Sequence, residues 1–190
     1  MDKQVTLILG GARSGKSTYA EKLAASFQQP VVYIATASAG DTEMQERIAA
    51  HRASRPGSWV TVEAQIDPGK AVLSANLSAD IFLLDCVTLW TSNVILSLPE
   101  PYSLQAAQSA MDKELDSLLN AIKQSGGRWI IVSNEVGLGL VPPYELGRLY
   151  RDTLGRVNQR LAAAADRVLF MVAGIPMLVK PGADVDDFHG

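Results

Sequence analysis

A glycine-rich segment follows the first apolar stretch of the chain. Residues 10–17 read Gly-Gly-Ala-Arg-Ser-Gly-Lys-Ser, which fits the pattern G-x-x-x-x-G-K-[ST]. Glycines allow a tight turn that directs several backbone N–H groups toward phosphate oxygens, and a following helix adds its positive N-terminal end. Lys16 supplies charge to the β- and γ-phosphates, and the Ser17 hydroxyl suits Mg²⁺. The segment predicts a nucleoside triphosphate site formed by Gly10, Gly11, Ala12, Arg13, Ser14, Gly15, Lys16 and Ser17.

A second element, which ends in an acidic residue, supports this interpretation. Residues 81–84 are all apolar and are followed by Asp85, the pattern of a Walker B strand. Such an acid orients Mg²⁺ or its water shell, so Ser17 and Asp85 are the predicted metal ligands. The Asn-Lys-x-Asp stretch of guanine-selective switches does not occur in the sequence, which disfavours a GTPase switch without excluding guanine.

One histidine has an unusual neighbourhood. His189 is near the end of the chain, whereas His51 falls in a predicted helix with Arg47, Arg52 and Arg55 close by. Guanidinium groups bind phosphate oxygens in pairs, and a neutral imidazole can attack a phosphorus atom. The plainer alternative is an amphipathic surface helix with solvated arginines, and spacing alone favours that alternative.

Alternating strands and helices are needed to position these residues. We expect strands at 5–9, 31–36, 59–62, 81–84, 129–132 and 168–172. We expect helices at 16–28, 42–54, from 67 onward, and at 87–96, 103–124 and 144–165. This order predicts a three-layer α/β/α P-loop domain with a mainly parallel sheet. Residues 1–180 are expected to form one domain and 181–190 a poorly ordered tail.

Composition narrows the class of protein. The chain has 190 residues and a formal net charge of −3, which disfavours a globally basic nucleic-acid binder. A single cysteine, Cys86, excludes an intramolecular disulfide and a cysteine-based zinc site. No apolar run approaches the roughly 20 residues that span a bilayer, and no secretory signal pattern is present. We therefore expect a cytoplasmic protein that neither binds nucleic acid nor inserts stably into a membrane.

Several blocks, in order, carry a more specific signal. They are residues 10–17, 33–36, 41–56, 83–86, 134–137 and 155–162, with Trp59 and Glu63 between them. Together they resemble the bifunctional adenosylcobinamide kinase / adenosylcobinamide-phosphate guanylyltransferase family of cobalamin biosynthesis. The resemblance extends to about Lys180.

The resemblance implies a RecA-like P-loop fold, a trimer and two reactions. ATP or GTP phosphorylates adenosylcobinamide, and GTP then transfers GMP to the product through a GMP-histidine intermediate at His51. By the same resemblance, the nucleotide site also includes Thr36, Ala37, Ser38, Arg52, Ala53, Ser54, Arg55, Glu63 and Asp85.

Two other functions are weighed against this one. In the first, the chain is a small-molecule P-loop kinase in which His51 is only structural. In the second, it is a nucleotide-binding regulatory module without an acceptor. The sequence does not identify the residue that orients the acceptor hydroxyl in the kinase step, for which Asp85 and Glu63 are the candidates. In the helix at 144–165, we expect Asp152 to pair with Arg148 and Arg156.

Overall fold

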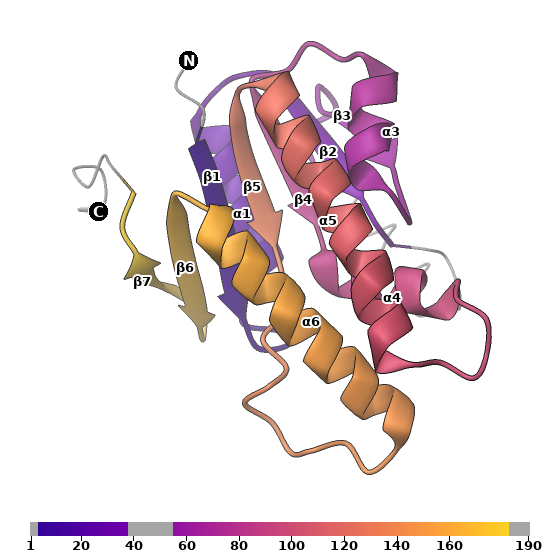
Figure 1. The fold of residues 1–190 in the computed structure, drawn as a ribbon. Coiled ribbons are helices and arrows are strands. Elements are labelled where there is room, and N and C mark those ends of the chain that lie inside the picture. Colours follow the sequence, from indigo (N-terminus) through magenta and orange to yellow (C-terminus); the bar gives the residue numbers. More distant parts are fainter. Residues whose placement is uncertain (1–3, 38–54, 183–190) are drawn as a thin grey trace.

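A seven-stranded sheet forms the centre of the molecule (Figure 1). The computed structural model describes residues 4–37 and 55–182. The strands are β1 (Gln4–Gly10), β2 (Val31–Ala35), β3 (Val60–Glu63), β4 (Ile81–Asp85), β5 (Arg128–Val132), β6 (Arg167–Val172) and β7 (Ile175–Lys180). Their order across the sheet is β3-β2-β4-β5-β1-β6-β7, and only the β6–β7 pair is antiparallel.

This order decides where the sequence motifs meet. The parallel strands β1 to β6 all end at the same edge of the sheet. Gly10, Asp85 and Glu63, which end β1, β4 and β3, are therefore brought to that edge. One strand, β5, lies between β1 and β4. Along this edge, Asp85 at the end of β4 is therefore followed by the end of β5 and then by the P-loop after β1.

Helices cover both faces of this sheet. Their bounds are α1 (Lys16–Ser26), α3 (Pro68–Ala75), α4 (Val87–Leu96), α5 (Leu104–Ser125) and α6 (Glu145–Ala164). One apolar cluster joins the sheet to α3, α4, α5 and α6, and a second joins its other face to α1 (Figure 1). Continuous apolar strands fit this arrangement because both of their faces are buried. The predicted three-layer α/β/α fold is confirmed.

The predicted elements agree with the observed ones to within a few residues wherever the structure describes them. The predicted helix at 42–54 lies outside the described residues. Strand β7 was not predicted, because it contains Pro176 and its other residues up to Val179 are all apolar, without the alternation of a half-buried strand. Proline is tolerated there because β7 is an edge strand. Across residues 4–37 and 55–182, no helix combines the length and apolar character required to cross a membrane.

The arginines of α6 also differ from expectation. Asp152 pairs with its neighbour Arg151 at 2.9 Å, not with Arg148 or Arg156. The guanidinium of Arg148 instead donates to the carbonyl oxygens of Pro142 and Pro143. Arg156 and Arg160 reach α5, where both bind Asp112. The spacing rule failed because these side chains find partners on a neighbouring helix and loop.

Close packing of α3 on α5 generates a stability prediction. A Cβ at Gly69 would lie 2.5 Å from the carbonyl carbon of Ser117, so Gly69→Ala must push the two helices apart. We expect a loss of about 1–3 kcal/mol in the free energy of unfolding, measured by urea denaturation. Gly155→Ala is the matched control, because a Cβ there meets no atom within 4 Å. That change should stabilise α6 by about 0.5–1 kcal/mol. Equal unfolding midpoints for the two variants would contradict the close contact.

Candidate active site

The P-loop is the turn between β1 and α1. Gly10 ends β1, and Gly15 is the residue before α1, with φ of 91°. That backbone conformation favours glycine, since other residues meet a steric penalty there. A Cβ at Gly10 would lie 2.6 Å from the carbonyl oxygen of Met171 on β6. Both motif glycines are thus required by the local geometry.

Backbone hydrogen bonds hold this loop from two sides. The N–H of Glu135, just beyond β5, donates to the Gly10 carbonyl at 3.0 Å. On the other side, the N–H of Gly174 in the β6–β7 turn donates to the Ser14 carbonyl at 2.9 Å. The loop is therefore built into the sheet by both neighbours of β1, which preorganises its amides for a phosphate group.

Lys16 lies inside the loop that precedes it. Its side chain is buried, and its ammonium group donates to the Gly11 carbonyl at 2.6 Å and to the Ser14 hydroxyl at 3.4 Å. A buried cation needs such oxygen partners to offset lost hydration. Phosphate oxygens are stronger acceptors for the same ammonium group, because they carry charge. The geometry therefore provides a preformed cation at the phosphate position.

Asp85 receives a fixed hydrogen bond at the end of β4. The Tyr33 hydroxyl donates to its Oδ2 atom at 3.0 Å. Burial and the adjacent Asp85 carboxylate raise the pKa of Tyr33 far above its usual value, so the phenol stays protonated and remains a donor. The Asp85 carboxylate and the Ser17 hydroxyl are oxygen donors of the kind that Mg²⁺ prefers. The donor set thus fits a magnesium ion held jointly with phosphate oxygens.

Arg55 packs against the same tyrosine. Its guanidinium carbon lies 3.2 Å from the centroid of the Tyr33 ring. Its Nε atom lies 3.5 Å from Oε1 of Glu21 on α1, and the two side chains are only 9% and 17% exposed. The family resemblance places Arg55 in the nucleotide site, and its contact with nucleotide stays a prediction; in the structure its guanidinium packs over Tyr33. Neither Tyr33 nor Glu21 was singled out from the sequence as a partner, because only the tertiary fold brings α1 and β2 to Arg55.

Thr36 makes hydrogen bonds that connect two strand ends. Its buried hydroxyl both donates to the Cys86 carbonyl and accepts from the Cys86 N–H, each at 2.8 Å. Its carbonyl oxygen accepts from the side chain of Asn93 at 2.8 Å. These bonds tie the end of β2 to the end of β4 and fix Asp85. Contact of Thr36 and the half-buried Ala37 with nucleotide stays a prediction.

Glu63 lies far from the P-loop along the same edge. It ends β3, the outermost strand, which is four strand positions from β1. With about 4.8 Å between neighbouring strands, that separation is roughly 19 Å. Glu63 therefore suits the remote part of a bound nucleotide or acceptor, not the transferred phosphoryl group. The remaining predicted residues, Ser38, His51, Arg52, Ala53 and Ser54, lie outside the described part of the chain.

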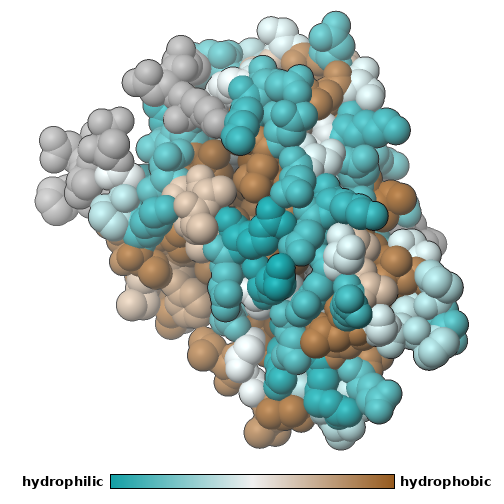
Figure 2. Space-filling view, in the orientation of Figure 1, coloured by the Kyte–Doolittle hydropathy of each residue, from teal (hydrophilic) through white to brown (hydrophobic). Residues whose placement is uncertain are grey.

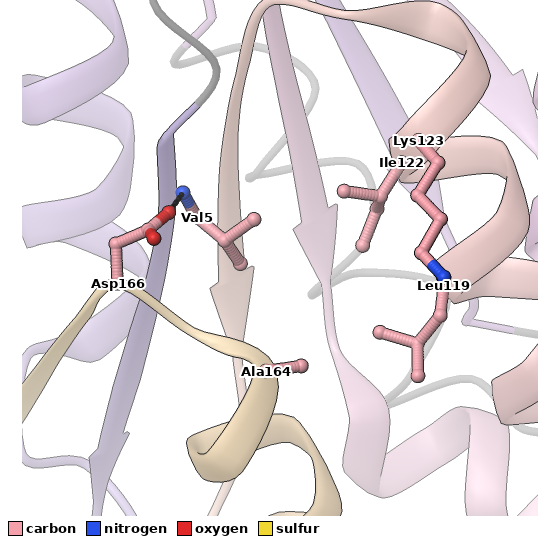
Figure 3. A pocket seen from close by; sticks show the side chains of 6 residues that line it. All are labelled: Val5, Leu119, Ile122, Lys123, Ala164 and Asp166. Atoms are coloured by element: carbon pink, nitrogen blue, oxygen red, sulfur yellow. Dashed lines mark hydrogen bonds between the residues drawn. The ribbon is translucent and has the colours of Figure 1, made fainter.

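A small cavity of about 170 Å³ opens at the opposite edge of the sheet (Figure 3). Val5 at the start of β1, Ala164 and Asp166 near the start of β6, and three residues of α5 line it. The Asp166 carboxylate there accepts a hydrogen bond from the Val5 N–H at 2.7 Å. Because Val5 and Asp166 lie at the start of their strands, this cavity is separate from the P-loop edge.

Comparison with known proteins matches nearly the whole chain. A family model described as cobinamide kinase / cobinamide phosphate guanyltransferase matches residues 6–179. Bifunctional adenosylcobalamin biosynthesis protein CobP of Pseudomonas aeruginosa is 47% identical over 174 residues, covering 92% of this chain and 96% of that protein. The corresponding CobU proteins of Salmonella typhimurium and Escherichia coli are 42% and 40% identical, each covering 92% of this chain and 98% of the relative.

The preformed cation predicts a specific loss on substitution. Lys16→Ala should weaken GTP binding by roughly 10- to 100-fold, the value of a hydrogen bond to a charged group. Isothermal titration calorimetry with GTP measures this directly. Lys22→Ala is the matched control, because Lys22 is exposed on the same helix and should leave the affinity unchanged. Equal GTP affinities for the two variants would exclude Lys16 as the phosphate-binding cation.

Proposed function

This chain belongs to the cobinamide kinase / cobinamide phosphate guanyltransferase family, and from that premise we propose how its residues perform the two reactions. The enzyme phosphorylates adenosylcobinamide with ATP or GTP. It then transfers GMP from GTP to adenosylcobinamide phosphate, which releases pyrophosphate and gives adenosylcobinamide-GDP. The observation that carries this assignment in the structure is the P-loop held at the same sheet edge as Asp85, with β5 between them.

In the kinase reaction, the chain binds and orients the triphosphate. The loop amides and the Lys16 ammonium group bind the β- and γ-phosphates, and the N-terminal end of α1 points at them. Ser17 and Asp85 would hold Mg²⁺, which neutralises charge on the β- and γ-phosphate oxygens when bound. The Tyr33 hydroxyl orients the Asp85 carboxylate for that task.

In the guanylyltransferase reaction, we assign the nucleophile to His51. A nitrogen of its imidazole attacks the α-phosphorus of GTP, and the bond to the pyrophosphate oxygen breaks. An oxygen of adenosylcobinamide phosphate then attacks the same phosphorus, and the imidazole leaves. Chain length supports the assignment, since four residues span at most about 14 Å and Arg55 packs on the tyrosine that binds Asp85. The neighbouring Arg52 would neutralise charge that develops on the phosphate oxygens.

We further propose that the enzyme works as a homotrimer in the cytoplasm, as the family resemblance implies. Exposed apolar side chains on the β6–β7 hairpin support an association of chains. Ile175, Met177 and Val179 are 66%, 54% and 64% exposed, and the brown surface over these strands is visible in Figure 2. Exposed apolar patches of this kind mark interaction sites.

The histidine assignment yields a labelling prediction. With Mg²⁺ and GTP, the protein should take up label from the α-phosphorus but not from the γ-phosphorus, because only GMP becomes bound to His51. The label should be acid-labile and base-stable, as expected for a phosphorus–nitrogen bond. It should disappear in His51→Ala and persist in His189→Ala, which removes the other histidine. Denaturing gels measure the bound label.

Two outcomes would contradict the mechanism. Label that survives in His51→Ala would place the nucleophile elsewhere. Absence of label in the wild-type protein, with GTP binding intact, would favour a P-loop kinase without guanylyltransferase activity.

A further inference from the structure

The end of β5 brings the backbone of Glu135 beside the P-loop. Strand β5 pairs with β1 on one side and with β4 on the other, with Val132 opposite both Ile8 and Asp85. Beyond the strand, the backbone continues along β1 until the Glu135 N–H reaches the Gly10 carbonyl at 3.0 Å. Glu135 is thus next to the first P-loop residue, one strand position from β1.

The position of the γ-phosphate follows from the neighbouring groups. Ser17 and Asp85, the proposed ligands, would hold Mg²⁺ between the P-loop and the end of β4, where it would neutralise charge on the phosphate oxygens. The strand between those two elements is β5. The γ-phosphate of the proposed complex would therefore lie near the end of β5, the strand that Glu135 follows.

Glu135 is oriented by its own loop. Its Oε1 atom accepts a hydrogen bond from the N–H of Gly137, two residues further on. A Cβ at position 137 would lie 2.9 Å from that oxygen, so only glycine leaves the carboxylate its place. The side chain of Glu135 is half-buried, whereas Leu138 and Leu140 in the same loop are 82% and 97% exposed. An acceptor that approached the P-loop over this apolar loop would pass the Glu135 carboxylate.

Among the residues that the structure describes, the other polar side chains near this strand end are unsuited to accept a proton. The Ser133 hydroxyl is buried and donates to the side-chain oxygen of Asn158 at 2.6 Å. The amide side chain of Asn134 is not basic. Asp85 binds the Tyr33 hydroxyl and is assigned to the metal, and Glu63 ends β3, which is three strand positions, or roughly 14 Å, from β5.

We propose that Glu135 is the catalytic base of the kinase reaction, an inference that rests on the proposed function. The acceptor hydroxyl oxygen forms a bond to the γ-phosphorus as the bond from that phosphorus to the β,γ-bridging oxygen breaks. The electron pair of the broken bond leaves with the nucleoside diphosphate. The hydroxyl proton passes to the Glu135 carboxylate.

The two reactions of this enzyme differ in their need for such a base. The kinase acceptor is an alcohol, which must lose a proton as it is phosphorylated. The acceptor of GMP is a phosphate group that is already anionic. A carboxylate that acts as the kinase base is therefore required for one reaction and dispensable for the other. A residue that only stabilises the fold would affect both.

The experiment compares both reactions in the full-length protein. Glu135→Gln should lower kcat for phosphorylation of adenosylcobinamide by about 10²- to 10⁴-fold, the usual effect of a general base. Transfer of GMP to chemically supplied adenosylcobinamide phosphate should remain within about threefold of wild type. Glu135→Asp should restore part of the kinase activity. Glu145→Gln, an exposed control at the start of α6, should change neither reaction.

A second variant tests the carboxylate's position. Gly137→Ala displaces the Glu135 oxygen without changing the charged residue, so it should also lower kinase kcat selectively. Combined with Glu135→Gln it should cause no further loss, because the two changes act through one group.

The results that overturn the proposal are distinct. If Glu135→Gln lowered the rates of both reactions equally, Glu135 would have only a structural role. If kinase kcat were unchanged in that variant, Glu135 would take no part in the kinase reaction. If wild-type protein bound nucleotide but performed neither corrinoid reaction, the proposed function itself would fail, and the role of Glu135 with it.

Discussion

Two backbone hydrogen bonds, from Glu135 to Gly10 and from Gly174 to Ser14, fix the phosphate-binding loop. Each comes from the segment that follows a strand adjacent to β1. The loop consequently has its turn and its enclosed Lys16 before any ligand binds. Such preorganisation matters because a loop that must order itself on binding loses part of the binding free energy. Strand order then brings the end of β4, with Asp85, to the same edge of the sheet as this loop.

A second set of contacts connects α1 to the end of β4. Glu21 faces Arg55, Arg55 stacks on Tyr33, and Tyr33 binds Asp85. A cation buried this deeply is stable only while its partners remain, because losing one leaves an uncompensated charge away from water. These contacts therefore hold Arg55, which directly follows the segment 38–54, next to Tyr33 and close to the predicted metal ligand Asp85. This is a structural role for a residue that the family resemblance placed in the nucleotide site.

Local motifs were predictable from the sequence, and long-range contacts were not. The P-loop and the Asp85 strand are contiguous patterns whose chemistry depends on backbone turns and strand ends, so their elements appear where expected. The partners of Arg156 and Arg160 lie on another helix, and no spacing within α6 reveals them. Glu135 was noticed only as part of a sequence block, because its closeness to Gly10 depends on β5 lying next to β1. The orientation of His51 toward the α-phosphorus stays a prediction, because His51 lies outside the described residues.

The place of β1 in the sheet also determines when the site can form during synthesis. Its two neighbours, β5 and β6, begin more than 120 residues after β1 itself, at Arg128 and Arg167. The Gly174 bond comes later still, from the turn before the last strand. A nascent chain that has left the ribosome only as far as β4 therefore carries the whole P-loop sequence but neither of the strands that pair with β1. Contacts this distant along the chain slow folding, and they make nucleotide binding one of the last properties that the growing chain acquires.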